Sequence, residues 1–365
     1  METTMPHSTS TAPPPPIPRK TFRLTFHGTG GALFGIFIMN LLKTICTLGI
    51  YFFWGKVRTR QFIWGQTEFA GDRFGYHGTG LELFLGWLKA ALLFGGIIAL
   101  QNAVGLGGHP ALGAAILWIG LAFLVPIAQI GALRYRLSRS SWRSVRFSFQ
   151  GEVQPFLIMS IRGLILTALT LGVFYPFYEC ESRGYLIRHC RFGSFKFEFD
   201  GKPLDLFWIY VKHILAGMAG AATMFALIFA WRDKSPLQSG DPAAMMAAVF
   251  SMILPLILVY GIVLLSLAVK RRQFYWHHTS FAGARFKTTV TMGNLFGLYA
   301  TNLLLLAATL GLAFPWITVR SRQYDCDHLT LTGALDLNAI QQDARTATAV
   351  GEELSGFLDV DAMTG

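Results

Sequence analysis

Long runs of apolar residues dominate the pattern of the chain. Four of them lie at Leu81 to Ala103, Ala111 to Leu133, Leu206 to Trp231 and Ala243 to Val269. Because a helix needs roughly 20 apolar residues to cross about 30 Å of hydrocarbon, each predicts a full transmembrane helix. Three further runs lie at Leu33 to Trp54, Pro155 to Tyr178 and Leu295 to Trp316. Each of these is interrupted by a Thr-Leu-Gly motif, a natural helix stop, and predicts a borderline helix that is re-entrant or kinked.

Six short stretches alternate aromatic and polar residues, which is the period of a half-exposed β-strand. They begin at Phe22, Arg73, Arg146, Lys196, Arg285 and Leu329. The sequences EFAGDRF and SFAGARF also predict tight hairpins, each with an Ala-Gly turn. We therefore expect an α-helical multi-pass membrane protein with a β-hairpin-rich cap, which gathers all six stretches on the cytoplasmic side.

The first two stretches continue into nearly the same phrase, FHGTGGALF and YHGTGLELF. A His beside Gly-Thr-Gly is compatible with phosphate binding, because glycine backbones approach an anion closely. Two later copies place an acidic residue next to the glycine, in QGE and DGK, and an acid repels phosphate. We therefore interpret the phrase as a connector from strand to helix.

The Thr-Leu-Gly motif begins at Thr47, Thr170 and Thr309, and its first two copies are 123 residues apart. This spacing predicts an internal repeat of three apolar segments. The predicted units are a proline-rich disordered tail (1–20), a first repeat (21–144), a second repeat (145–284), a partial third repeat (285–337) and a polar acidic tail (338–365).

Composition and charge agree with a membrane protein. Hydrophobic residues make up 53% of the 365 residues and charged residues 14%, and the mean hydropathy is +0.45. If only the four long runs cross, 25 of the 27 Lys and Arg residues outside the apolar runs share one side. Because positively charged loops stay cytoplasmic, we expect both termini there. The alternative of seven crossings divides these residues 13 to 14 and is typical of inverted-repeat transporters.

Polar residues inside the apolar segments are candidates for function, because hydrocarbon solvates them poorly. The candidate ligand-binding residues are Lys43, Arg162, Asn40, Asn302, Lys89 and Lys212. The apolar cores contain no acid to pair with Arg162, so we expect it to face the interior, close to Lys43 or the two Asn amides. For Lys89 and Lys212 the alternative is that they snorkel to the interface.

Other site chemistry finds little support in the sequence. The four cysteines show no CxxC spacing, the adjacent His-His and His-Cys pairs point apart on a strand, and no nucleotide-binding or metalloprotease motif occurs. We expect no cofactor, no metal and no nucleic-acid partner. Enzymatic activity and oligomeric state stay open.

The motifs together resemble a known family. The recurring TLG-x-x-[FY]-[PF]-[WF], followed in its first and third copies by R-x-R, accompanies SFAGARF and RFSFQG. This combination, over roughly residues 20 to 337, is similar to the YjgN-like bacterial inner-membrane proteins, which are defined by a domain of unknown function. The resemblance implies a multi-pass protein of the bacterial cytoplasmic membrane and no established reaction or substrate. The first copy departs from the others in having Phe53 in place of proline.

Two functional hypotheses follow from these features. In the first, the protein is a transporter or channel for a small anionic solute, with the cationic and amide side chains facing a cavity. In the alternative, it transports nothing and binds anionic lipid or a partner protein through its basic cytoplasmic surface. The substrate itself is not readable from the sequence.

Overall fold

The computed structural model describes residues 20–231 and 241–335, so the two predicted tails lie almost entirely outside the described residues. The described strands are β1 (Lys20–Phe26), β2 (Thr67–Phe69), β3 (Asp72–Tyr76), β4 (Ser140–Trp142), β5 (Val145–Phe149), β6 (Cys190–Phe192), β7 (Phe195–Phe199), β8 (Thr279–Phe281), β9 (Ala284–Thr288) and β10 (Leu329–Gly333). The described helices are α1 (Gly30–Cys46), α2 (Phe52–Gly65), α3 (Gly80–Leu106), α4 (Pro110–Ser138), α5 (Val153–Leu169), α6 (Tyr175–Arg188), α7 (Pro203–Trp231), α8 (Pro242–His277), α9 (Met292–Ala308) and α10 (Phe314–Asp327).

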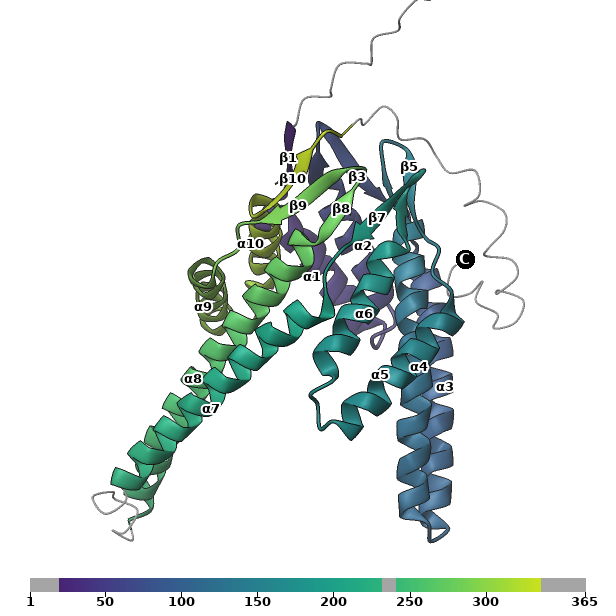
Figure 1. Ribbon diagram of the computed structural model, residues 1–365. Coiled ribbons are helices and arrows are strands. Elements are labelled where there is room, and N and C mark those ends of the chain that lie inside the picture. Colours follow the sequence, from purple (N-terminus) through teal and green to yellow (C-terminus); the bar gives the residue numbers. More distant parts are fainter. Residues whose placement is uncertain (1–19, 232–240, 336–365) are drawn as a thin grey trace, which may run out of the picture.

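The ten strands form one closed antiparallel barrel, in the order β1-β10-β9-β8-β7-β6-β5-β4-β3-β2 (Figure 1). The first strand pairs with the last, Lys20 opposite Gly333, and also with β2, Leu24 opposite Phe69. The expected β-hairpin-rich cap on a helical membrane protein is therefore wrong. A row of hairpins leaves two edge strands with unpaired backbone groups, and closure into a barrel removes both edges.

Tight turns join the strands at one end of the barrel. At the Ala-Gly turns of EFAGDRF and SFAGARF, Ala70 and Gly71 have φ of 50° and 88°, and Ala282 and Gly283 have φ of 48° and 77°. Positive φ at both central residues is typical of the turns that fit a two-residue hairpin. The β2–β3 and β8–β9 hairpins confirm the two turns predicted from the sequence.

Pairs of helices join the strands at the other end of the barrel. In each pair, a backbone hydrogen bond links the residue that follows the preceding strand to the residue that follows the second helix. The five bonds run from His27 N to Gln66 O (2.8 Å), His77 N to Arg139 O (2.7 Å), Gln150 N to His189 O (3.0 Å), Asp200 N to His278 O (3.1 Å) and Thr289 N to His328 O (3.0 Å). Each helical hairpin therefore leaves and returns at the same end of the barrel, and the alternative of seven single crossings is wrong.

The hairpins are of two lengths. Helices α3, α4, α7 and α8 are long and apolar enough to cross a membrane, and in Figure 1 the α3–α4 and α7–α8 hairpins project from the barrel in diverging directions. The apolar helices α1, α5 and α9 have 17 residues each, which is about 25 Å of helix. Each is followed by a shorter returning helix, so the three borderline runs are helical hairpins in the structure and not single kinked helices.

The Thr-Leu-Gly motif forms the tip of each short hairpin. After Thr47, the Leu and Gly adopt φ of 50° and 96°, which stops α1 and reverses the chain. The Thr47 hydroxyl then accepts a hydrogen bond from the Tyr51 amide at 2.9 Å, just before α2. Equivalent bonds occur at Thr170 and Thr309, both at 3.0 Å. The motif is thus a turn signal, in which the Thr hydroxyl caps the returning helix and the Gly adopts positive φ without a steric penalty.

The repeated FHGTGG phrase is a connector, as predicted. A Cβ on Gly28 would lie 2.6 Å from the Phe26 ring, so only glycine lets the ring fold over the chain. Thr29 caps α1 by accepting a hydrogen bond from the Ala32 amide at 3.4 Å. A Cβ on Gly30 would overlap the indole of Trp316 on α10. The residues of this phrase therefore fit close packing where the strand becomes a helix.

Candidate functional site

The candidate residues predicted from the sequence are not brought together. Asn40 is buried, and its amide donates to the Gly55 carbonyl at 3.1 Å. Asn302 is also buried, and its amide donates to the Ser321 hydroxyl at 3.4 Å. Both bonds tie the outgoing helix of a short hairpin to its returning helix. Asn40 therefore holds α1 against α2, and Asn302 holds α9 against α10.

The two cations placed deepest in the short hairpins also contact their own hairpins. The Lys43 ammonium lies 5.2 Å from the centre of the Tyr51 ring. The Arg162 guanidinium on α5 forms an ion pair with Glu181 on α6 at 2.7 Å, and the Arg162 side chain is 58% exposed. Glu181 lies beyond the apolar run of residues 155–178, so the contact of Arg162 in the structure is an acid on the returning helix and not Lys43 or the two Asn amides.

The remaining candidates lie on the long hairpins. Lys89 is half-buried on α3, and Lys212 is exposed on α7. The neighbour of Lys212, His213, bonds to the Ser266 hydroxyl on α8 at 3.1 Å. This contact ties α7 to α8, so it has a structural explanation.

A larger feature is a groove beside the first short hairpin, which we call the cationic groove. It has a volume of about 840 Å³ and is bounded by the tip of the α1–α2 hairpin, by α2 and by the facing sides of α3 and α4. Its apolar wall contains Phe53, Phe84 and Trp87, whose ring centres lie 5.2 to 6.3 Å apart. Leu48 and Ile50 extend this wall to the hairpin tip.

Three cations line the same groove nearer the barrel. Lys56 and Arg60 come from α2, one turn apart, and Arg136 comes from α4. Arg60 donates to the Tyr76 hydroxyl at 3.1 Å, and Arg136 donates to the Ala132 carbonyl at 3.3 Å. Among residues 20–231 and 241–335, none of the three cations forms an ion pair with an acidic side chain. The groove therefore carries uncompensated positive charge.

The single acid in the wall is already engaged. Glu82 pairs with Arg139 at 2.9 Å and accepts a hydrogen bond from the Tyr135 hydroxyl at 3.1 Å. It also completes the capping box of α3 with Thr79. Burial, and then repulsion by Arg60 and Arg136, lowers the pKa of Lys56. The lowered pKa shows that the charged form of Lys56 lacks both solvation and a nearby negative charge. An anion bound beside it would raise the pKa again.

The second short hairpin shows a closed version of the same arrangement. Glu179 on α6 is only 4% exposed and forms an ion pair with Arg271 on α8. It also pairs with Arg183 at 3.3 Å and accepts a hydrogen bond from the Tyr210 hydroxyl at 2.6 Å. Here the protein supplies its own carboxylate to the arginines, so no external anion is needed.

Sequence reasoning missed Lys56, Arg60 and Arg136 because it assigned them to basic loops. The signal that points to the first two is their spacing of four residues, which puts both on one side of a helix. No sequence signal links Arg136 to them, because it is 80 residues from Lys56 and reaches the groove only through the return of α4.

Comparisons with known proteins bear on the family and the location. The family model described as bacterial protein of unknown function (DUF898) matches residues 21–357. Inner membrane protein YjgN of Escherichia coli (strain K12) is 31% identical over 156 residues, which cover 43% of this chain and 37% of the relative. The protein of the same name from Salmonella typhimurium is 23% identical over 370 residues, 88% of this chain and 91% of the relative. No solved structure matches the chain.

These findings establish the family of the protein and support its location in the inner membrane. The chain spans 37% of the length of the Escherichia coli relatives that it matches. The names of the relatives and the four long apolar helices support an integral protein of the inner membrane. Because the family model covers most of the sequence, the chain belongs to the DUF898 family of bacterial proteins, as the resemblance of its motifs predicted.

Proposed function

We propose that the protein binds an anionic membrane lipid in the cationic groove. The observation that carries this proposal is the group of three cations, Lys56, Arg60 and Arg136, without acidic partners among the described residues, beside an apolar wall. A lipid phosphate supplies the missing negative charge, and Arg is well suited to bind it through two parallel hydrogen bonds. The lipid chains lie along Phe53, Phe84 and Trp87.

The order of polar and apolar residues along the groove fits an amphiphile. Leu48 and Ile50 lie at the hairpin tip, farthest from the barrel along α2, whereas Lys56 and Arg60 follow one and two turns into that helix. Nine residues, about 13 Å of helix, separate Lys56 from Gly65 at the barrel end of α2. A lipid with its phosphate at Lys56 therefore points its chains toward the tip, as it does in the bilayer.

The arrangement of the other cations favours lipid binding over transport of a small anionic solute. A solute pathway requires Lys43 and Arg162 to face a common cavity, but Lys43 contacts Tyr51 and Arg162 is neutralised by Glu181. The helices that carry them pack against different neighbours, α1 against α2 and α10, and α5 against α4 and α6. Transport of an anionic solute is therefore the weaker proposal.

The barrel and both described chain ends face the cytoplasm in this proposal. Support comes from the charge distribution, since 25 of the 27 Lys and Arg residues outside the apolar runs share one side if only the four long runs cross. In this orientation the groove opens to the cytoplasmic leaflet. Anionic lipids there attract basic residues near the surface by about 1 kcal/mol each.

The test is lipid retention measured by native mass spectrometry on the full chain. Purified protein in detergent is mixed with equal amounts of phosphatidylglycerol and phosphatidylcholine. We expect the wild type to retain phosphatidylglycerol preferentially, and Lys56→Gln and Arg136→Gln to lose that preference. The control is Lys212→Gln, which removes an exposed cation from a long helix outside the groove and should behave like the wild type.

Two results would overturn the proposal. Equal losses in Lys56→Gln and Lys212→Gln would show that any interfacial cation holds the lipid. Uptake of a small anion such as phosphate into proteoliposomes, abolished by Lys43→Gln or Arg162→Gln and not by Lys56→Gln, would favour the transport hypothesis. Thermal unfolding of each variant in the same detergent shows whether the fold is intact.

A further inference from the structure

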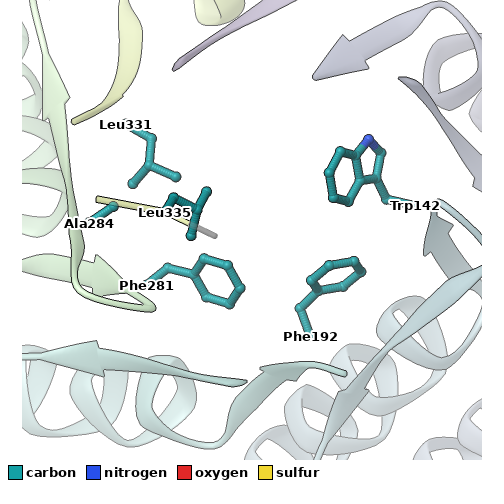
Figure 2. Close-up of a cluster of buried hydrophobic side chains, with 6 residues drawn as sticks. All are labelled: Trp142, Phe192, Phe281, Ala284, Leu331 and Leu335. Atoms are coloured by element: carbon teal, nitrogen blue, oxygen red, sulfur yellow. The ribbon is translucent and has the colours of Figure 1, made fainter. Parts of the chain in front are cut away.

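The interior of the barrel contains a cavity that the lipid groove does not use. Its volume is about 220 Å³, and its wall is built mainly from aromatic side chains, among them Phe74, Trp142, Phe147, Phe197 and Phe281. Alternate residues of each strand point inward, which explains the alternating aromatic and polar pattern of the strand sequences. Figure 2 shows Trp142 and Phe281 from separate strands directed toward a shared space.

The cavity exists because the barrel is wide. A barrel of about eight strands is just wide enough for side chains to fill its interior, and this barrel has ten. The rings contact their neighbours along the wall, with ring centres 4.5 Å apart for Phe147 and Phe192 and 4.7 Å for Phe197 and Phe281. Rings that pack against their neighbours in this way leave the cavity between them unfilled.

The chemistry of the wall is almost entirely apolar. The Trp142 indole N–H already donates to the carbonyls of Phe69 and Asp72, at 3.2 and 3.1 Å. The Thr330 hydroxyl donates to the Lys287 carbonyl at 3.3 Å. No charged side chain lines the cavity in the described part of the chain. Water needs two or more polar partners in a cavity, and this wall offers too few to hold it, whereas an apolar cavity of about 150 Å³ already admits a molecule as large as benzene.

The cavity also extends over the height of the barrel. Leu329 is the first residue of β10, at the end where the helices begin, and it lines the cavity. Phe69 and Phe281 line it at the opposite end, beside the tight turns. The space is therefore elongated along the barrel axis, and one end faces the membrane helices.

We propose that the barrel interior binds an uncharged aliphatic chain, inserted along the barrel axis from the helix side. The apolar wall excludes a charged or hydrogen-bonding ligand, because such a ligand would lose its hydration without replacement. The elongated shape favours a chain over a compact ring system. The chain belongs either to a free aliphatic molecule or to a membrane lipid, and the experiment below separates these sources.

The experiment is photolabelling of the purified full chain in detergent. One probe is a decyl diazirine, and the other is phosphatidylcholine with a diazirine at the end of one chain. We expect the decyl probe to label peptides that contain Phe281 and Leu331. Labelling of the same peptides by the lipid probe identifies a lipid chain as the source, and labelling by the decyl probe alone identifies a free chain.

Two variants change the cavity in opposite directions. Leu331→Trp fills the interior and should abolish labelling, whereas Phe197→Ala enlarges it and should admit a hexadecyl diazirine that the wild type excludes. Leu112→Trp, at an exposed position on α4, is the control and should label like the wild type. If Leu331→Trp does not fold, Phe197→Ala decides alone. Labels confined to the outer surfaces of α3, α4, α7 and α8, or a chain-length limit unchanged in Phe197→Ala, would overturn the proposal.

Discussion

Lys56 and Glu179 are each the fifth residue of a 14-residue returning helix, and they carry opposite charges in opposite surroundings. Lys56 lines an open groove together with Arg60 and Arg136, whereas Glu179 is buried against Arg271. Their separation of 123 residues equals that of the first two Thr-Leu-Gly motifs. At the α5–α6 hairpin the carboxylate of Glu179 thus neutralises the neighbouring arginine. At the α1–α2 hairpin the equivalent position is a lysine, and the groove keeps its positive charge.

Removal of the buried carboxylate should destabilise the protein strongly. Glu179→Gln leaves the half-buried Arg271 without its charged partner. Loss of one member of a fully buried ion pair costs about 3 to 5 kcal/mol, which is an upper limit here because the Arg271 side chain is 28% exposed. The matched control is Glu181→Gln on the same helix, which breaks the exposed pair with Arg162 and should cost about 1 kcal/mol or less. Thermal unfolding in detergent compares the two variants. Equal shifts would show that the Glu179 pairs contribute no special stability.

Phosphatidylglycerol binding should weaken at alkaline pH in the wild type. Burial and the neighbouring arginines lower the pKa of Lys56, so this lysine loses its charge below the ordinary lysine pKa of about 10.4. Affinity should therefore fall as the pH rises through the lowered pKa. The variant Lys56→Arg stays charged over this range, and its affinity should be flat. Parallel pH profiles of the two proteins, measured by lipid retention, would contradict the assignment of Lys56 to the headgroup.

The same shift has a consequence for stability without lipid. The folded-state pKa of Lys56 lies below its unfolded value, so the unfolded chain binds more protons between the two values. The contribution of Lys56 to stability therefore rises with pH through this window and is lost as the pH falls through the folded-state pKa. Added phosphatidylglycerol should reduce this dependence, because it raises the pKa of Lys56.

Two neighbouring glycines at the start of α1 should respond differently to substitution. Gly30→Ala places a methyl group into the indole of Trp316 and should destabilise the protein by about 1 to 3 kcal/mol. Gly31→Ala meets no atom within 4 Å and should stabilise the helix by up to about 1 kcal/mol. Thermal unfolding tests both, and a loss of stability in both variants would show that the first turn of α1 tolerates no side chain.

The proposed orientation predicts which residues are accessible from the periplasm. In a cysteine-free background, His109→Cys marks the tip of the α3–α4 hairpin, and Arg73→Cys marks an exposed position on barrel strand β3. In spheroplasts, a membrane-impermeant maleimide should label the cysteine at position 109, and the one at position 73 only after lysis. The reverse labelling order would place the barrel in the periplasm.

Local sequence patterns were sufficient to predict most of the helices, strands and turns. Four apolar runs became helices long enough to span a membrane, because run length and hydrophobicity are local properties. The turns after Thr47 and at Ala70-Gly71 were readable because each contains a glycine, Gly49 or Gly71, and glycine has no Cβ that would oppose positive φ. The alternation in strands such as β7 was readable because successive strand residues face opposite sides.

The closure of the barrel and the contents of the groove depend on contacts between distant parts of the chain. Lys20 and Gly333 pair across almost the whole sequence, and no local pattern distinguishes closed strands from a row of hairpins. Arg162 pairs with Glu181 because α6 returns beside α5. Lys56 and Arg136 line one groove because α3 packs against α2 on one side and α4 returns beside α3. Local sterics and hydropathy determined the helices, strands and turns. The tertiary structure decided which charges are paired and which face the open groove, because each hairpin returns to the barrel and is held there by backbone hydrogen bonds such as that of His27 with Gln66.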